Sequence, residues 1–93
     1  MRAIRLISPK ESAGNSFANG SNIQLATNVL CVHTGGTAGV VTVLNSAGTA
    51  GGGTFVLNAA GSGDAVIIIA KKPTDVIYAN QGSIEFTSVL TEA

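Results

Sequence analysis

The stretch VLCVHTGGTAGVVTVL, residues 29–44, decides the fold class. Apolar and β-branched side chains dominate 29–33 and 40–44, and a Gly-rich segment, 34–37, lies between them. Short β-branched runs bounded by Gly and Thr are typical of strands and turns. The stretch therefore predicts two strands, 29–33 and 40–44, which we expect to pair with each other as a hairpin.

Further strand patterns recur at short intervals on both sides of this stretch. They cover 2–7, 23–26, 54–57, 65–70, 76–79 and 83–90. No segment keeps an apolar i, i+3, i+4, i+7 spacing over three turns, so helices are not expected. We predict an all-β fold, a small antiparallel β-sandwich or barrel of about seven or eight short strands. Residues 1–93 form a single domain, in which 1–20 are a strand or arm followed by a loop.

The segment AVIIIA, 65–70, is apolar at every position. We expect it to be a central strand, buried on both faces or covered by a partner. The predicted core joins it to the strands 40–44 and 83–90, and consists of Val41, Val43, Val66, Ile68, Ile84 and Phe86. Replacement of Ile68 with alanine should then cost roughly 2–5 kcal/mol.

The composition indicates a protein that is covered by other protein. Only 11% of the residues are charged, against about 25% in an ordinary soluble domain. Few charges leave little to keep neighbouring molecules apart. We therefore expect a component of an assembly, and a homo-oligomer, with a trimer preferred.

Several classes of function do not fit this sequence. Net charge is zero, with five acidic and five basic residues, so phosphate-driven nucleic-acid binding is not expected. No stretch reaches the ~18 apolar residues of a membrane span, and the apolar run at 3–7 is too short for a signal peptide. Cys31 is the only cysteine, which excludes an internal disulfide.

The residues that carry chemistry in other proteins are scattered here. The Gly-rich run 48–53 lacks the Lys-Ser/Thr and the helix of a phosphate-binding loop. Cys31 and His33 share a strand face but point in parallel, so they are not expected to act as a catalytic pair. The carboxylates Asp64, Asp75, Glu85 and Glu92 are dispersed. We expect no catalytic, cofactor-binding or metal-binding residues.

The candidate contact residues lie in two places. The segment 1–7 is an apolar strand with two arginines, and it can serve either as an arm that adds to a neighbour's sheet or as an internal edge strand. The corner KKPTD, 71–75, places two lysines where they either block edge pairing or bind a partner. The candidates are Arg2, Ile4, Arg5, Leu6, Lys71 and Lys72.

The C-terminal half resembles small virion structural proteins of tailed bacteriophages, especially phages of cyanobacteria and other marine bacteria. The resemblance rests on the apolar strand within 63–69, the pentapeptide Lys-Lys-Pro-Thr-Asp at 71–75, the Ile-containing strand 76–79 and the final strand 84–90. The paired-strand segment 28–44 is also similar.

This resemblance implies a non-enzymatic virion protein, made in the bacterial cytoplasm and located in the virus particle. The expected function is a capsid decoration (cement) protein that binds the outer capsid surface, with the major capsid protein or other virion proteins as partners. One alternative is a tail, neck or fibre-base component. A second is a receptor- or glycan-binding module, which the scarcity of Trp and Tyr disfavours.

Overall fold

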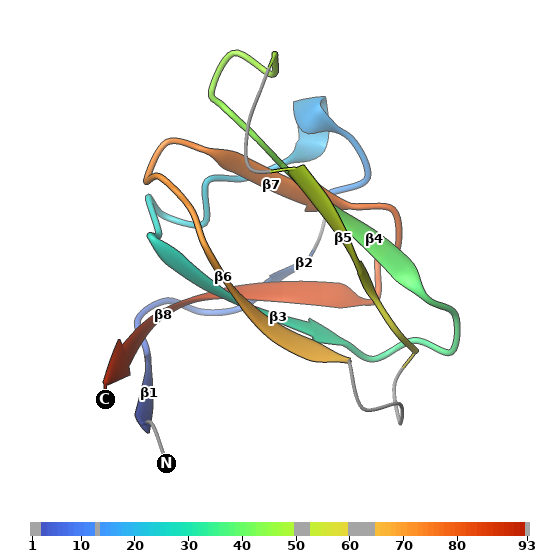
Figure 1. Ribbon diagram of the computed structural model, residues 1–93, viewed down its shortest axis with the longest axis horizontal. Coiled ribbons are helices and arrows are strands. Elements are labelled where there is room, and N and C mark those ends of the chain that lie inside the picture. The colour runs from blue at the N-terminus through green and yellow to red at the C-terminus, as the bar shows by residue number, and fades with distance from the viewer. Residues whose placement is uncertain (1–2, 13, 50–52, 60–64, 93) are drawn as a thin grey trace.

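The computed structural model describes residues 3–12, 14–49, 53–59 and 65–92, and these form two antiparallel sheets packed face to face (Figure 1). The described residues contain eight strands and one 3-10 turn, η1 (Phe17–Asn19). The strands are β1 (Ala3–Leu6), β2 (Glu11–Ser12), β3 (Asn28–His33), β4 (Gly39–Leu44), β5 (Gly53–Leu57), β6 (Val66–Ala70), β7 (Val76–Ala79) and β8 (Ile84–Glu92). The predicted all-β, antiparallel sandwich is confirmed.

The order of the strands determines which edges of the two sheets are open. The five-stranded sheet has the order β1-β8-β3-β6, with β2 also paired to β8, and the three-stranded sheet has the order β5-β4-β7. Strand β6 is therefore an edge of the larger sheet, and β5 is an edge of the smaller one. In Figure 1, β6 lies in front of β3 and β8, and β5 lies in front of β4. Both edge strands thus face the same side of the molecule.

The core lies between the two sheets and is built from alternate residues of the strands. Buried positions alternate with half-buried ones along both β3 and β4, as expected for strands with one face on the core. The largest fully buried side chains in this core are Phe86, Ile23, Leu57, Ile77, Ile84, Val29 and Val41. Of the predicted core residues, Val41, Val43, Ile84 and Phe86 are confirmed.

The predicted hairpin between 29–33 and 40–44 is wrong. Both strands exist, but β3 pairs with β6 and β8, whereas β4 pairs with β5 and β7. The segment between them crosses from one sheet to the other instead of reversing within one sheet. His33 stabilises this crossing, because the Gly35 N–H donates to its Nδ1 at 3.2 Å and its Nε2 contacts the Thr37 carbonyl.

The predicted central position of 65–70 is also wrong. Strand β6 pairs only with β3 among the described strands, so one of its edges is open. Val66 is 56% exposed and Ile67 is 39% exposed, while Ile68 is half-buried. Val66 and Ile68 are therefore not part of the core. The cost that the sequence predicted for Ile68→Ala, which assumed full burial, is too large.

The segment predicted as a strand at 23–26 is a turn with an unusual backbone. Ile23, Gln24 and Leu25 have φ values of 52°, 55° and 60°, in the left-handed region that L-residues other than Gly, Asn and Asp rarely occupy. The Ala26 N–H donates to the carbonyls of Asn22 and Ile23, both at 3.2 Å. The turn places Ile23 in the core with no exposed surface, and this burial offsets the backbone strain.

We expect the substitution Gln24→Gly to stabilise the protein by about 0.5–1 kcal/mol. Gln24 is exposed, so little contact is lost, and glycine adopts the left-handed conformation without a Cβ penalty. Gln24→Ala is the matched control, because it shortens the side chain but keeps the Cβ. Urea unfolding of the two variants measures the effect, and equal midpoints would contradict a left-handed conformation at this position.

The N-terminal segment packs onto β8 of its own chain. Strand β1 pairs with residues 89–92 and β2 pairs with residues 85–86. Between them the Ile7 N–H donates to the Ser88 carbonyl at 2.8 Å, and the Ser88 N–H donates to Ser8 Oγ at 3.2 Å. The Ser8 side chain thus replaces a backbone acceptor where the chain leaves β8 near Pro9. In this structure β1 is an internal edge strand, one of the two roles considered for segment 1–7.

Candidate interaction surface

The only histidine has a structural role in the crossing between the sheets. His33 is 2% exposed, and its Nδ1 accepts from the Gly35 N–H and lies 3.2 Å from Ser83 Oγ. Because a backbone N–H only donates and a carbonyl only accepts, the ring proton is on Nε2, which contacts the Thr37 carbonyl. Both ring nitrogens are therefore occupied by these contacts.

Cys31 is a buried thiol with no catalytic partner in the described structure. Its side chain has no exposed surface, and Sγ lies 3.9 Å from the Val29 carbonyl rather than against His33. Burial raises the pKa of Cys31 to about 12, because the thiolate would lose its hydration. A protonated, inaccessible thiol is a poor nucleophile and a poor metal ligand.

The acidic side chains of the described residues form no cluster that could hold a metal ion. No group of three or more His, Cys, Asp or Glu residues that could hold a metal ion occurs among the described residues. Asp64 lies outside them. Asp75 caps its own corner, since its Oδ2 accepts from the Lys72 N–H at 3.2 Å. No helix in the described ranges is long and apolar enough to cross a membrane.

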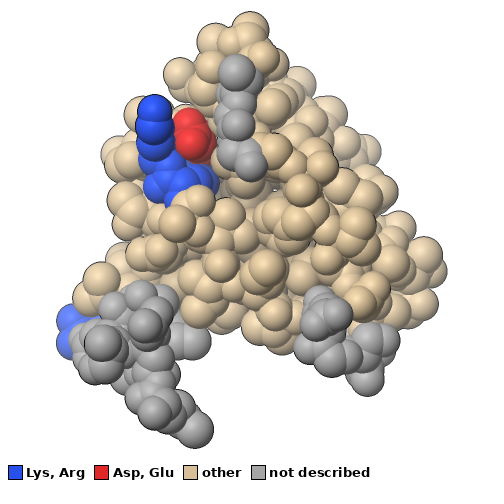
Figure 2. Space-filling model, in the orientation of Figure 1, with Lys and Arg blue, Asp and Glu red and all other residues tan. Residues whose placement is uncertain are grey.

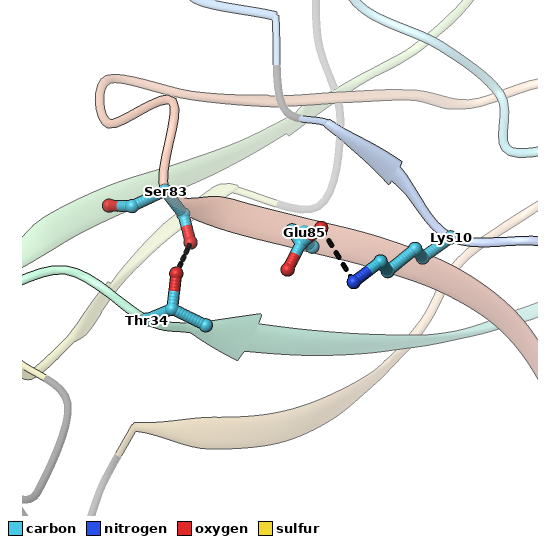
Figure 3. A network of polar contacts seen from close by, with 4 residues as sticks. All are labelled: Lys10, Thr34, Ser83 and Glu85. Carbon is cyan, nitrogen blue, oxygen red and sulfur yellow. Dashed lines mark hydrogen bonds and ion pairs between the residues drawn. The ribbon is translucent and has the colours of Figure 1, made fainter.

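Polar contacts hold the beginning of β8 against the residues that follow β3 and precede β2 (Figure 3). Thr34 Oγ1 donates to the Ser83 carbonyl at 3.0 Å, and Lys10 Nζ lies 3.3 Å from Glu85 Oε2. The ion pair joins the segment before β2 to β8, and Lys10 is largely exposed. Such an exposed pair contributes at most about 1 kcal/mol, so its main effect is to neutralise Glu85.

The structure separates the candidate contact residues into two groups. Arg2 lies outside the described residues, and Ile4 lies in β1 opposite Thr91. Arg5 and Leu6 follow in β1, where both side chains are exposed. Lys71 directly follows β6, at the end of the five-stranded sheet where Arg5 and Leu6 of β1 also lie. With β8 and β3 between β1 and β6, the two groups are about 14 Å apart, so they do not form one patch.

The two lysines of the 71–75 corner differ in their surroundings. Lys71 is half-buried, and its Nζ donates to the carbonyls of Lys72 at 3.1 Å and Pro73 at 3.2 Å. Burial lowers the pKa of Lys71, partly offset by the Asp75 carboxylate. Lys72 is exposed. The Lys71 ammonium group thus serves the turn itself, and Lys72 is the freer of the two for a partner.

The outward surface of β3 and β6 is more apolar than the outward surface of an ordinary sandwich. In an antiparallel pair, residues opposite each other point to the same side of the sheet. Leu30 is opposite Ile68, and Val32 is opposite Val66. Their neighbours Val29 and Cys31 are buried in the core, so these four side chains point away from it. We call Leu30, Val32, Val66 and Ile68 the apolar outer face.

This apolar outer face carries almost no charge. Among residues 28–33, 66–70 and 84–90, Glu85 is the only Asp, Glu, Lys or Arg, and it is paired with Lys10. Figure 2 views the side where β5 and β6 lie, and its charged side chains gather at the corner formed by the β6–β7 connection, with one more basic group at the lower left. The outward side of a solvent-exposed antiparallel sheet is normally polar.

Sequence reasoning did not select the apolar outer face as a contact site. The sequence did contain a signal, because 66–69 is apolar at consecutive positions. A strand in a two-layer sandwich has only one face on the core. Every second side chain of such a run must therefore point outward. The sequence interpretation placed both halves in the core or against a partner, and it did not distinguish between these.

Comparison with known proteins does not identify the chain. No protein-family model matches it, and no curated protein and no solved structure is similar enough to count as a match.

Proposed function

We propose that this protein is a non-enzymatic structural protein of a tailed-phage particle, and specifically a capsid decoration protein. The observation that carries the proposal is the apolar outer face, Leu30, Val32, Val66 and Ile68, on a sheet with one ion-paired carboxylate nearby. Val66 is exposed and the other three side chains are half-buried, and apolar patches that reach the surface of small soluble domains mark protein contact sites. The resemblance of 63–90 to small virion proteins of tailed bacteriophages supports the assignment to a phage particle.

The small size of the domain fits this role. A 9.2 kDa chain covers only a small area, so each copy makes a limited contact with the shell. Many copies that each bridge neighbouring capsid subunits add their contacts, and the stability of the shell then rises through multivalency. The protein is made in the host cytoplasm and functions on the virion, with the major capsid protein as its partner.

Binding to shells tests the proposal directly. The purified chain is mixed with empty shells of the major capsid protein from the same genome, and the shells are separated on a density gradient. We expect the chain to sediment with the shells at a fixed stoichiometry, and electron microscopy should show it on their outer surface. Absence from shells together with binding to purified tails would replace decoration with the tail alternative, and binding to neither would overturn the virion assignment.

A matched pair of variants tests the apolar outer face. Leu30 and Thr42 each lie at the outward side of a middle strand, in the five-stranded and three-stranded sheets respectively, and both are half-buried. Leu30→Glu should weaken shell binding at least about tenfold, because the carboxylate must lose its water on contact. Thr42→Glu should bind like the parent chain. Equal loss in both variants, with both still folded, would place the contact elsewhere.

A further inference from the structure

The open edge of β6 has a regular pattern of backbone groups. The His33 N–H donates to the Ala65 carbonyl and the Lys71 N–H donates to the Thr27 carbonyl, both at 2.9 Å. These bonds lie at the two ends of the β3–β6 pair. In an antiparallel pair, residues that exchange hydrogen bonds alternate with residues that do not. Ile67 and Ile69 lie two and four residues after Ala65, so they are also hydrogen-bonding positions. Their backbone groups therefore point toward β3.

The remaining residues of β6 direct their backbone groups away from β3. Val66, Ile68 and Ala70 each present one N–H and one C=O at the open edge, and no strand among the described residues pairs with them. Proteins usually protect such an edge with a charge, a proline or a bulge. Strand β6 contains no charged residue and no proline, so it keeps the features that favour pairing with another strand.

We propose that β6 pairs with β6 of a second copy of this chain, antiparallel and about a two-fold axis at Ile68. The outward residues 66, 68 and 70 are symmetric about position 68. In this register Ile68 is opposite Ile68 of the second copy, and Val66 is opposite its Ala70. All six outward groups, three N–H and three C=O, then form hydrogen bonds between the copies. A self-complementary edge of this kind defines an isologous dimer, in place of the trimer that the sequence suggested.

The side chains fit the same register. On the outward side, Leu30 and Ile68 of one copy continue into Ile68 and Leu30 of the other, which forms a row of four aliphatic side chains. The large Val66 is opposite the small Ala70. On the core side, Ile67, which is 39% exposed, comes opposite Ile69 of the second copy. Aliphatic cross-strand pairs of this kind stabilise sheets, and the pairing covers the exposed side chains of β6.

Charge does not oppose this contact. Strand β6 is uncharged, and the Lys71 ammonium that follows it turns back onto the carbonyls of Lys72 and Pro73. Two identical edges therefore meet without like charges in the paired region. The other open edge on this side, β5, is less suitable because it begins at Gly53, whose φ of 98° lies outside the extended region. The pairing does not depend on binding to a capsid, so either can fail without the other.

Charged substitutions at Ile68, the residue on the proposed two-fold axis, test the pairing of the two copies. Sedimentation of the full chain at roughly 100 µM should show a dimer of the 9.2 kDa monomer. Ile68→Lys and Ile68→Glu each place like charges directly opposite each other, so each should raise the dimer dissociation constant at least about tenfold. An equal mixture of the two variants should restore the dimer, because Lys then faces Glu. Thr42→Lys, at the outward side of the other sheet, is the control and should dimerise normally.

Hydrogen exchange of the unmodified chain provides a second test that does not rely on folded variants. The amides of Val66, Ile68 and Ala70 should become protected only as the protein concentration rises. The amides of Ile67 and Ile69 bond to β3 and should be protected at every concentration. A monomer or trimer at the highest concentration, a dimer unaffected by charge at position 68, or protection of the three outward amides that does not depend on concentration would each overturn the proposal.

Discussion

Replacement of Phe86 with alanine is expected to lower the free energy of unfolding by about 3–5 kcal/mol. Phe86 is 1% exposed and is the largest fully buried side chain in the described structure. It lies on β8, opposite Cys31 of β3 and Glu11 of β2, where it packs between the two sheets. A domain of this size has a total stability of only about 5–15 kcal/mol, so the substitution removes much of it.

Urea unfolding followed by circular dichroism measures this effect, with Ile68→Ala as the matched control. Ile68 is half-buried on an edge strand, and its truncation should cost about 1 kcal/mol. The comparison is best made near 1 µM, where pairing between copies contributes little. Equal losses from the two substitutions would mean that β6 belongs to the core after all.

The second large effect is a loss of stability at alkaline pH that depends on Cys31. Burial raises the pKa of this thiol from 9.0 to about 12. Below pH 9 the thiol is protonated in both the folded and the unfolded chain, and its contribution to stability is fully present. Above pH 9 the unfolded chain releases the proton and the folded chain retains it. Stability then falls by up to about 1.4 kcal/mol per pH unit until the pH reaches the folded pKa.

A comparison with Cys31→Ala isolates the thiol from other groups that titrate in the same range. The variant has lower stability at pH 8, because it leaves a small cavity, but its stability should decline less between pH 9 and 11. The difference between the parent chain and the variant should therefore shrink by about 2 kcal/mol over those two pH units.

Thiol accessibility provides an independent check on the burial of Cys31. In the folded protein at pH 8, a thiol reagent should react with Cys31 far more slowly than in urea, where the thiol is exposed and its pKa is ordinary. Equal rates in both conditions would show that Cys31 is accessible and that its pKa is not raised.

The sequence alone determined the fold class and the positions of most strands. Short β-branched and apolar runs bounded by Gly, Asn and Pro predict strands because the preference is local, and β4 and β7 match the predicted 40–44 and 76–79 to within one residue. Low charge was also evident from the sequence, and it pointed to a surface in contact with other protein.

Only the tertiary structure decided which strands pair and which edges stay open. The loop 34–38 can either close a hairpin or cross between sheets, and the cost of closing a chain segment depends only weakly on its length. The apolar run of β6 looks the same at the centre of a sheet as at its edge, because its neighbours are distant in sequence. The left-handed turn at Ile23 forms because the core offers that side chain a buried position. Strand pairing and burial depend on contacts with residues that are distant in the sequence, so a local sequence pattern does not reveal them.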